Sequence, residues 1–269
     1  MAGETTGTET TGGTAAAVQG AVEHGGGAHN PLEQFQIKRL IPIHIGDLDL
    51  SFTNSALFML IAVALITLFL TYAMRSRALI PGRLQSMAEL SYEFVANMIR
   101  ENVGSEGRRY FPFIFTLFMF ILFGNVLGMF PFTFTYTSHI IVTFALAAVV
   151  FIGVTVIGFV RHGATFLKLF VPSGVPPFLL PLLVVIEILS YLTRPISLSV
   201  RLFANMMAGH TMLKVFGGFV VALGILGGWA PLAFVVALTG LEIGIAFLQA
   251  YVFTILTCIY LNDAINLHH

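Results

Sequence analysis

Five ionisable side chains interrupt long apolar stretches in the second half of the chain, namely Glu187, Arg194, Arg201, His210 and Glu242. An arginine at the centre of a membrane helix costs about 2.5–3.5 kcal/mol, so such groups are rare and usually mark ion pathways. Carboxylates and imidazoles exchange protons when their surroundings move their pKa toward ambient pH. A guanidinium stays protonated and acts as a fixed positive charge. The set therefore predicts proton transfer beside a permanent cation.

The first polar region follows one face of a helix. Glu187, Arg194 and Arg201 are spaced seven residues apart. At this spacing their directions drift by only about 20° per step, so the three side chains share one face. Asn205 lies one turn beyond Arg201 on nearly the same face. Arg201 is therefore expected near the middle of a polar stripe.

A second polar region follows from the remaining residues. His210 comes nine residues after Arg201, which directs it to roughly the opposite side of a helix with 3.6 residues per turn. Glu242 and Gln249 are again seven residues apart, so the next helix also presents one polar seam. If the two helices form an antiparallel pair, His210 can meet Glu242 across the hairpin.

Structural roles remain open for several of these residues. Arg194 could extend its charged end to the membrane interface, and Glu187 could serve only as its ion-pair partner. His210 and Glu242 could merely hydrogen-bond the hairpin together. Arg201 is different, because no acidic residue of the chain lies one turn from it. A partner protein that supplies a carboxylate would complete the pair.

Composition indicates the environment of these residues. The chain has 269 residues, 13 Lys+Arg against 13 Asp+Glu, 57% hydrophobic residues and only 10% charged residues. Soluble domains carry roughly 25% charged residues, so the composition predicts an integral membrane protein. The balanced charge gives no footprint for nucleic acid. Cys258 is the sole cysteine, which excludes an internal disulfide and a cysteine zinc site.

The first half of the chain divides into four segments. Residues 1–30 are rich in Gly, Ala and Thr, and we expect a disordered tail. Residues 51–74 form the first predicted span, residues 84–104 an amphipathic helix on the membrane surface, and residues 110–160 a hairpin of two spans. Basic residues follow the first span, so the N-terminus is expected outside and the C-terminus in the cytoplasm. The basic residues are Arg75, Arg77 and Arg83.

The second half forms a pair of long helices, predicted at residues 178–214 and 232–262. The apolar run from residue 178 to residue 213 contains 36 residues, or roughly 54 Å of straight helix. The hydrocarbon core is only about 30 Å thick, so this helix must tilt steeply or bend, and Pro195 offers a cause for a bend. Glycines from Gly217 onward are expected to end it. Residues 266–269 form the C-terminal end.

The predicted fold is therefore an all-α polytopic membrane protein with one membrane domain over residues 31–265. It has about five transmembrane helices plus one amphipathic surface helix, and its last two helices are long and steeply tilted as a hairpin.

Three stretches resemble subunit a of F-type ATP synthases. The strongest resemblance is residues 193–210, TRPISLSVRLFANMMAGH. Residues 248–253, LQAYVF, resemble the last helix of that family, and residues 88–95, AELSYEFV, resemble its surface helix. The resemblance covers about residues 35–265. It implies a proton-conducting stator subunit beside a rotating ring of c subunits, each with a carboxylate at membrane depth.

The resemblance also implies roles for individual residues. Arg201 matches the essential arginine of the family and would act as the proton gate. The outer half-channel would be lined by Asn205, His210, Glu242 and Gln249. The cytoplasmic half-channel would be lined by Glu187, Ser190, Thr193, Arg194 and Ser197. Compared with some family members, the acidic residue and the histidine are exchanged between the positions of His210 and Glu242, and a family acidic position is Gly128 here.

The resemblance further implies the setting. The partners would be the c-subunit ring, b-type peripheral stalk subunits, the rest of the ATP synthase complex and the lipid bilayer. The chain would be a non-catalytic subunit with no ATP chemistry, no cofactor and no metal. Its location would be the bacterial cytoplasmic (inner) membrane, with an organellar inner membrane as the alternative.

Two other classes of protein remain as alternatives. One is a stand-alone secondary transporter or proton channel, and the other is a structural membrane scaffold. A self-contained transporter should carry its own counter-charge for Arg201, which this chain lacks. A scaffold has no use for five ionisable groups at membrane depth.

Overall fold

The computed structural model describes most of the chain from residue 39 onward. The described residues are 39–41, 44–45, 48–49, 51–75, 81–130, 133–171 and 178–266. The predicted tail, residues 1–30, lies outside the described residues, as do residues 172–177 and 267–269.

Two short antiparallel strand pairs precede the first helix. Strand β1 (Arg39–Ile41) pairs with β4 (Phe52–Thr53), and β2 (His44–Ile45) pairs with β3 (Leu48–Asp49). Sequence analysis assigned no strands to this segment. Each strand has only two or three residues, so these ladders add a small β element to a helical protein.

Three helices follow the strand pairs. Helix α2 (Asn54–Ala73) begins where the Thr53 hydroxyl accepts a hydrogen bond from the amide of Ala56 at 3.3 Å, which caps the helix. Helix α3 (Arg83–Asn102) is the amphipathic helix. A 3₁₀ helix, η2 (Ser105–Tyr110), leads into α4 (Phe111–Gly128).

The hairpin and the long pair complete the fold. A short 3₁₀ turn, η3 (Tyr136–Ser138), connects α4 to α5 (Ile140–His162), which continues into η4 (Gly163–Phe170). Helix α6 (Leu180–Gly227) and helix α7 (Trp229–Ile265) are the longest elements. Among the described residues, five helical segments are long and apolar enough to cross a membrane. The all-α polytopic prediction with five spans is confirmed.

Helix α6 does not end where sequence analysis expected. It continues past Gly217 and Gly218 to Gly227 and is 48 residues long. A glycine in a helix costs only about 1 kcal/mol relative to alanine, whereas breaking backbone hydrogen bonds in lipid costs several kcal/mol per group. The non-helical position is Gly224, with φ of 59°. Only Gly228 separates α6 from α7.

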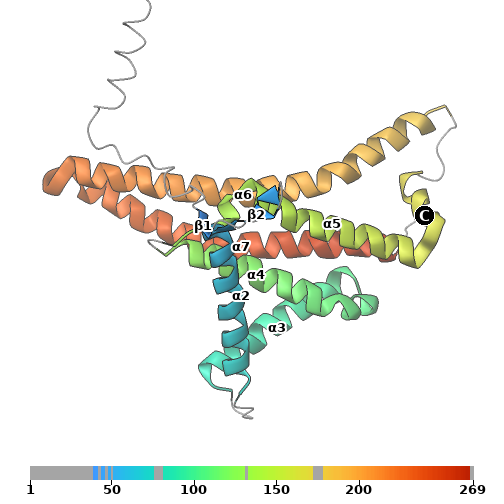
Figure 1. The fold of residues 1–269 in the computed structure, drawn as a ribbon, viewed down its shortest axis with the longest axis horizontal. Coiled ribbons are helices and arrows are strands. Elements are labelled where there is room, and N and C mark those ends of the chain that lie inside the picture. The colour runs from blue at the N-terminus through green and yellow to red at the C-terminus, as the bar shows by residue number, and fades with distance from the viewer. Residues whose placement is uncertain are drawn as a thin grey trace, which may run out of the picture. The chain divides into compact units, whose positions relative to one another are not determined.

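The long pair crosses the direction of the first span. In Figure 1, α6 and α7 run alongside each other, and α2 runs across them. The first part of α6 is inclined to the rest of the helix in the same view. Pro195 lies inside α6, where it removes one helical hydrogen bond and favours such a bend. Pro231 does not break α7, because it lies in the first turn, where no partner for its missing amide is needed.

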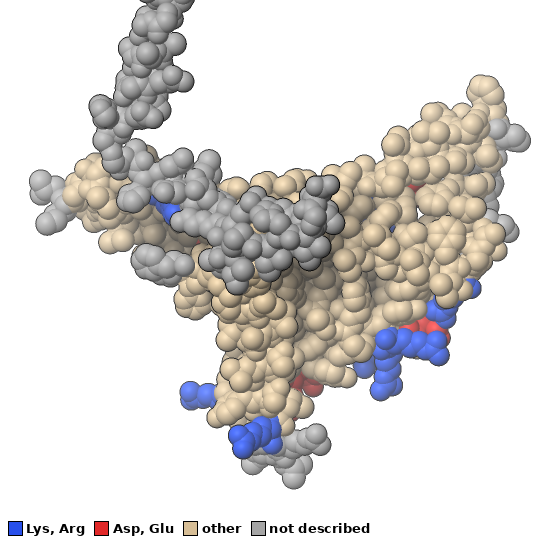
Figure 2. Space-filling view, viewed as in Figure 1, with Lys and Arg blue, Asp and Glu red and all other residues tan. Residues whose placement is uncertain are grey.

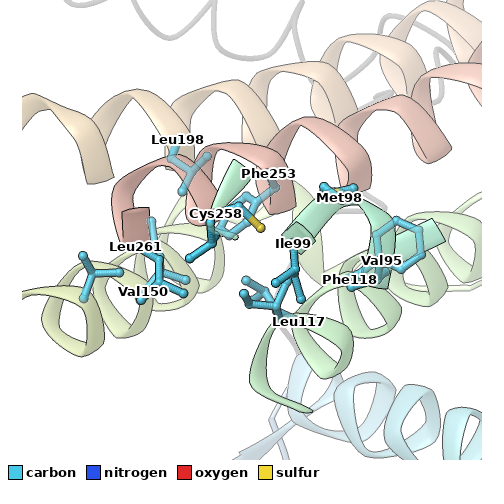
Figure 3. Close-up of a cluster of buried hydrophobic side chains, with 14 of the residues drawn as sticks. Val95, Met98, Ile99, Leu117, Phe118, Val150, Leu198, Phe253, Cys258 and Leu261 are labelled. Carbon is cyan, nitrogen blue, oxygen red and sulfur yellow. The ribbon is translucent and has the colours of Figure 1, made fainter. Parts of the chain in front are cut away.

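Helix α7 is central to the packing, because it contacts α3, α4, α5 and α6. The buried side chains between them form one apolar cluster, shown in Figure 3. Its members include Val95, Phe118, Val150, Leu198 and Phe253, one from each of these five helices. This packing fixes which residues of α6 and α7 can face each other.

Much of the outer surface is apolar. Exposed side chains include Leu68 (65%), Ile141 (71%) and Val221 (82%). Figure 2 shows a broad face with almost no charged residues, and the visible Lys, Arg, Asp and Glu side chains gather mainly at its lower edge. A surface of this kind suits contact with lipid rather than water.

Candidate functional site

The side chains of His210 and Glu242 are in direct contact between α6 and α7. Nδ1 of His210 lies 2.7 Å from Oε1 of Glu242, and the two side chains are only 10% and 6% exposed. The close approach depends on Gly209, because a Cβ at that position would lie 2.7 Å from the same carboxylate oxygen. The sequence-based expectation that these two residues meet therefore agrees with the geometry.

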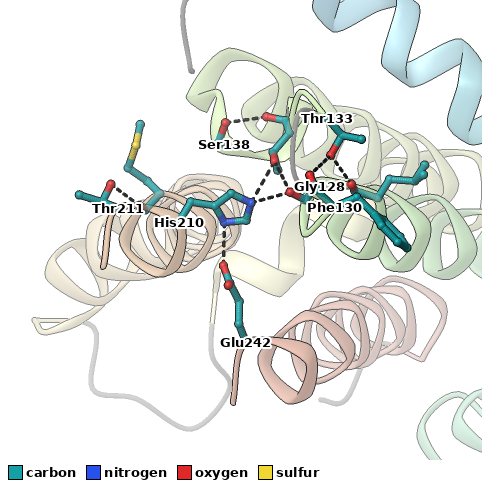
Figure 4. A network of polar contacts seen from close by, with 10 residues as sticks. Gly128, Phe130, Thr133, Ser138, His210, Thr211 and Glu242 are labelled. Atoms are coloured by element: carbon teal, nitrogen blue, oxygen red, sulfur yellow. Dashed lines mark hydrogen bonds and ion pairs between the residues drawn. The ribbon is translucent and has the colours of Figure 1, made fainter. Parts of the chain in front are cut away.

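The other nitrogen of His210 contacts the α4–α5 hairpin. Nε2 lies 2.8 Å from the carbonyl oxygen of Gly128 and 3.1 Å from the hydroxyl of Thr135 (Figure 4). A Cβ at Gly128 would lie 2.4 Å from the Thr135 hydroxyl, so a larger residue would displace this contact. We call His210, Glu242, Gly128 and Thr135 the His210 cluster.

The partners of the imidazole determine what the His210 cluster can do with a proton. Nδ1 faces a carboxylate and Nε2 faces a carbonyl oxygen, so both nitrogens can donate as an imidazolium. If Glu242 carries the proton instead, it can donate to Nδ1 while Nε2 keeps its bond to Gly128. The two groups can therefore share one proton without any change of neighbours.

Polar groups continue along α7 from the His210 cluster. Nδ2 of Asn205 donates to Oε1 of Gln249 at 2.7 Å. Asn125 on α4 donates to the carbonyl of Ala246 at 3.2 Å. In the described part of the chain, Oε2 of Glu242 and Nε2 of Gln249 are buried without a hydrogen-bond partner. Buried polar atoms of this kind require water or another partner.

Arg201 has a different environment. It is exposed on α6, and none of the ion pairs between described residues includes it. Asn205, one turn further along, is also exposed. Val200, next to Arg201 in the sequence, is 44% exposed and adds apolar surface beside it.

Arg194 has the partner that Arg201 lacks. Nη1 of Arg194 donates to Oδ2 of Asp263 at 2.9 Å, which joins α6 to the last turns of α7. The guanidinium also lies over the rings of Tyr191 and Tyr260, at 5.3 Å and 4.9 Å from their centroids. We call these four residues the Arg194 clamp. The partner of Arg194 is therefore Asp263, and the alternative of a pair with Glu187 is not formed among the described residues.

Asp263 is absent from the predicted site because the helix predicted from the sequence ends one residue before it. A longer helix would have indicated the residue, since Asp263 is the only acidic side chain of α7 besides Glu242. Thr135 gave no such signal, because it lies 75 residues from His210 and in a turn.

The remaining predicted residues lie along α6. Glu187 is partly buried, while Ser190, Thr193 and Ser197 are exposed. Within this group the hydroxyl of Thr193 donates to the carbonyl of Ser190 at 2.8 Å, a contact inside the helix. Thus α6 and α7 bring the predicted outer residues into two contacts, whereas the predicted cytoplasmic residues stay spread along one helix.

Across the described ranges, no group of three or more His, Cys, Asp and Glu side chains could hold a metal ion. The available chemistry is proton exchange at His210 and Glu242 together with fixed positive charge at Arg194 and Arg201.

These features define a class of protein: a multi-pass helical membrane protein with ionisable residues inside its two longest helices, as in proteins that move ions. Residues 56–262 match the family model described as ATP synthase A chain. The chain belongs to this family. It is therefore a membrane-sector subunit of an ATP synthase complex and takes part in proton transport.

Individual relatives agree with this assignment. The chain is 63% identical over 243 residues to ATP synthase subunit a of Pelagibacter ubique (strain HTCC1062), which covers 90% of this chain and 100% of the relative. It is 62% identical over 245 residues to ATP synthase subunit a of Paramagnetospirillum magneticum (strain AMB-1). This alignment covers 89% of this chain and 99% of the relative. It is 61% identical over 240 residues to ATP synthase subunit a of Rhodospirillum rubrum. This alignment covers 89% of this chain and 100% of the relative.

Proposed function

We propose that this chain is the proton-conducting stator subunit of a rotary ATP synthase. In this proposal, two aqueous half-channels and an arginine gate couple proton flow to rotation of a c-subunit ring. The observation that carries the proposal is the environment of Arg201. It is an exposed, permanent charge on an apolar helix, and no described residue of the chain forms an ion pair with it.

The gate follows from the chemistry of the guanidinium. Its pKa is above about 12, so it cannot relay protons at ordinary pH. A carboxylate that passes close to it is held in the ionised form. Arg201 between two half-channels would therefore block direct leakage and require each proton to travel on a c-subunit carboxylate. Each proton supplies roughly 2.3 kcal/mol per 100 mV of membrane potential.

The His210 cluster supports an outer half-channel. His210 and Glu242 can share one proton across 2.7 Å, and the contact between Asn205 and Gln249 extends the polar path toward Arg201, one turn away. Such a path would admit protons from the non-cytoplasmic side and deliver them beside the gate.

The cytoplasmic half-channel would use the beginning of α6. Glu187, Ser190, Thr193 and Ser197 supply its polar side chains, and Arg194 adds a positive charge that the Arg194 clamp keeps in place. Because Arg194 is already paired with Asp263, we propose that it positions this half-channel without exchanging protons.

Charge at the helix ends supports the proposed orientation. Arg75 follows α2, Arg108 and Arg109 precede α4, and Arg161 ends α5. These four arginines stand on the same side if each helix crosses once, and basic residues favour the cytoplasm. The N-terminus would then be outside and the C-terminus inside, in a bacterial cytoplasmic membrane. The c-ring and b-type stalk subunits would be the immediate partners.

The experiment replaces Arg201 with alanine in the whole complex. In inverted vesicles, acridine-dye quenching should show no ATP-driven pumping by Arg201→Ala, although the complex assembles. After removal of the catalytic head, the membrane sector should leak protons, because the charge between the half-channels is gone. Near-normal coupled pumping by Arg201→Ala would refute the gate.

A further inference from the structure

A groove lies where the surface helix meets the next span. It has a volume of about 680 Å³ and is bounded by α3, η2 and the start of α4. The rings of Tyr92 and Phe111 line it, with their centroids 4.5 Å apart, and Pro112 adds apolar surface. Arg100 and Arg108 also line it. The groove thus combines an apolar lining with two cations.

The turn at Gly104 brings these two arginines to one groove. Gly104 has φ of 78°, a conformation that glycine adopts without strain. It reverses the chain between the end of α3 and η2, so that residues from both helices line the same space. Although Arg100 and Arg108 lie on separate elements, the fold directs both to it.

Neither arginine is neutralised within the described part of the chain. Both are exposed, and none of the ion pairs there includes them. The acidic residue of η2 is Glu106, which pairs with Arg161 instead. The groove therefore keeps two positive charges beside apolar surface.

We propose that this groove binds an anionic phospholipid, with the phosphate at Arg100 and Arg108 and the glycerol and upper acyl chain against Tyr92 and Phe111. Planar guanidinium groups match phosphate oxygens with paired donors, and basic pockets beside membrane helices bind acidic lipid headgroups. The exposed apolar residues of α3, such as Met87 (57%) and Leu90 (69%), indicate that the helix lies against lipid rather than in water.

A neighbouring groove provides a matched comparison. It has a volume of about 350 Å³ and is lined by Arg109 and Arg161, with Val156 and Val160 among its apolar residues. Since Arg161 is paired with Glu106, Arg109 is the one lining cation of this groove outside the ion pairs of the described residues. Arg109 follows Arg108 directly in the sequence. Arg109→Gln and Arg108→Gln each remove one positive charge, but Arg109→Gln removes it from the smaller groove.

The test uses the intact ATP synthase complex in phosphatidylcholine nanodiscs. The probe is a trace of phosphatidylglycerol with a photoreactive acyl chain, and mass spectrometry measures labelling of the peptide containing residues 92–112. The double variant Arg100→Gln with Arg108→Gln should reduce labelling roughly twenty-five-fold, because each basic residue near an anionic lipid contributes about fivefold. Arg109→Gln should change it less than about twofold, which serves as the control.

Competition in the wild-type complex tests the site without any substitution. Unlabelled phosphatidylglycerol should displace the probe, while phosphatidylcholine and millimolar inorganic phosphate should not. If phosphatidylcholine displaced the probe equally well, the groove would bind lipid tails without recognising the headgroup charge. If inorganic phosphate displaced it equally well, the groove would be an anion site without lipid recognition. Either result overturns the proposal. Loss of another subunit from the double variant, with labelling unchanged, would identify a protein-docking surface and also overturn it.

Discussion

Arg194 and Arg201 stand seven residues apart on one face of α6, yet their surroundings differ sharply. The side chain of Arg194 is 21% exposed, pairs with Asp263 at 2.9 Å and lies over two tyrosine rings. Arg201 is exposed, and no ion pair within the described residues includes it. The same residue type on the same helix face is neutralised in one case and left available in the other.

The opposing helix, and not the periodicity of α6, determines which of the two arginines is paired. A charge at membrane depth is costly unless it is paired, so a chain built only for stability would pair both arginines. Helix α7 supplies a carboxylate to Arg194 through Asp263 and none to Arg201. We infer that the counter-charge of Arg201 belongs to another subunit.

The largest difference is expected when each arginine is replaced by lysine. Arg201→Lys should abolish ATP-driven proton pumping, because an ammonium lacks the planar, delocalised charge and loses its proton far more readily when it is desolvated. Arg194→Lys should retain most pumping, since lysine keeps the charge and can still contact Asp263. Acridine-dye quenching in inverted vesicles compares the two variants directly.

Immunoblotting of the purified complexes checks that both lysine variants assemble. If Arg194→Lys abolished pumping as completely as Arg201→Lys, the two arginines would have equivalent roles and the comparison would fail.

A smaller but clear loss is expected at the His210 cluster. Glu242→Gln keeps the volume of the side chain but removes the group that shares a proton with His210, so ATP synthesis should slow by roughly tenfold or more. Glu101→Gln on α3, outside the spans, is the control and should leave the rate unchanged. ATP synthesis by energised vesicles gives the rate, and loss of the subunit from the complex would instead indicate a structural role for Glu242.

The next effect concerns stability rather than transport. Asp263→Asn removes the carboxylate of the Arg194 clamp, and the partly exposed pair should contribute about 1 kcal/mol. A double variant with both Arg194→Asp and Asp263→Arg, which exchanges the two charges, should recover part of this loss of stability. Thermal unfolding of the purified complex, followed through dissociation of this subunit, measures the difference. If Asp263→Asn were as stable as the wild type, the clamp would be only an incidental contact.

Much of the fold could be predicted because membrane burial imposes simple rules. Long apolar runs of spanning length identified the five spans, and helical periodicity identified α3 as the amphipathic helix. The end of α6 could not be predicted from glycines alone, because Gly217 stays helical while Gly224 takes a positive φ. The short strands before α2 are too brief to leave a pattern.

The site was predictable where a residue pair lies on adjacent long helices. Seven-residue spacing placed Glu242 and Gln249 on one seam, and the structure joins them to His210 and Asn205. The contact with Thr135 required knowledge of how the α4–α5 turn packs against α6, which spacing does not contain. The Arg194 clamp required the register of α6 against α7.

The smallest expected effect separates the aromatic part of the Arg194 clamp from its ion pair. The guanidinium lies 4.9 Å from the centroid of the Tyr260 ring, and such a contact contributes about 0.5–1 kcal/mol. Tyr260→Leu should therefore lower the stability of the complex by about this amount, whereas Tyr260→Phe should be close to wild type because it keeps the ring face. The dissociation assay used for Asp263→Asn measures both variants. Equal losses for leucine and phenylalanine would assign the effect to the hydroxyl group, and the contrast between Arg194 and Arg201 would then rest on Asp263 and Tyr191 alone.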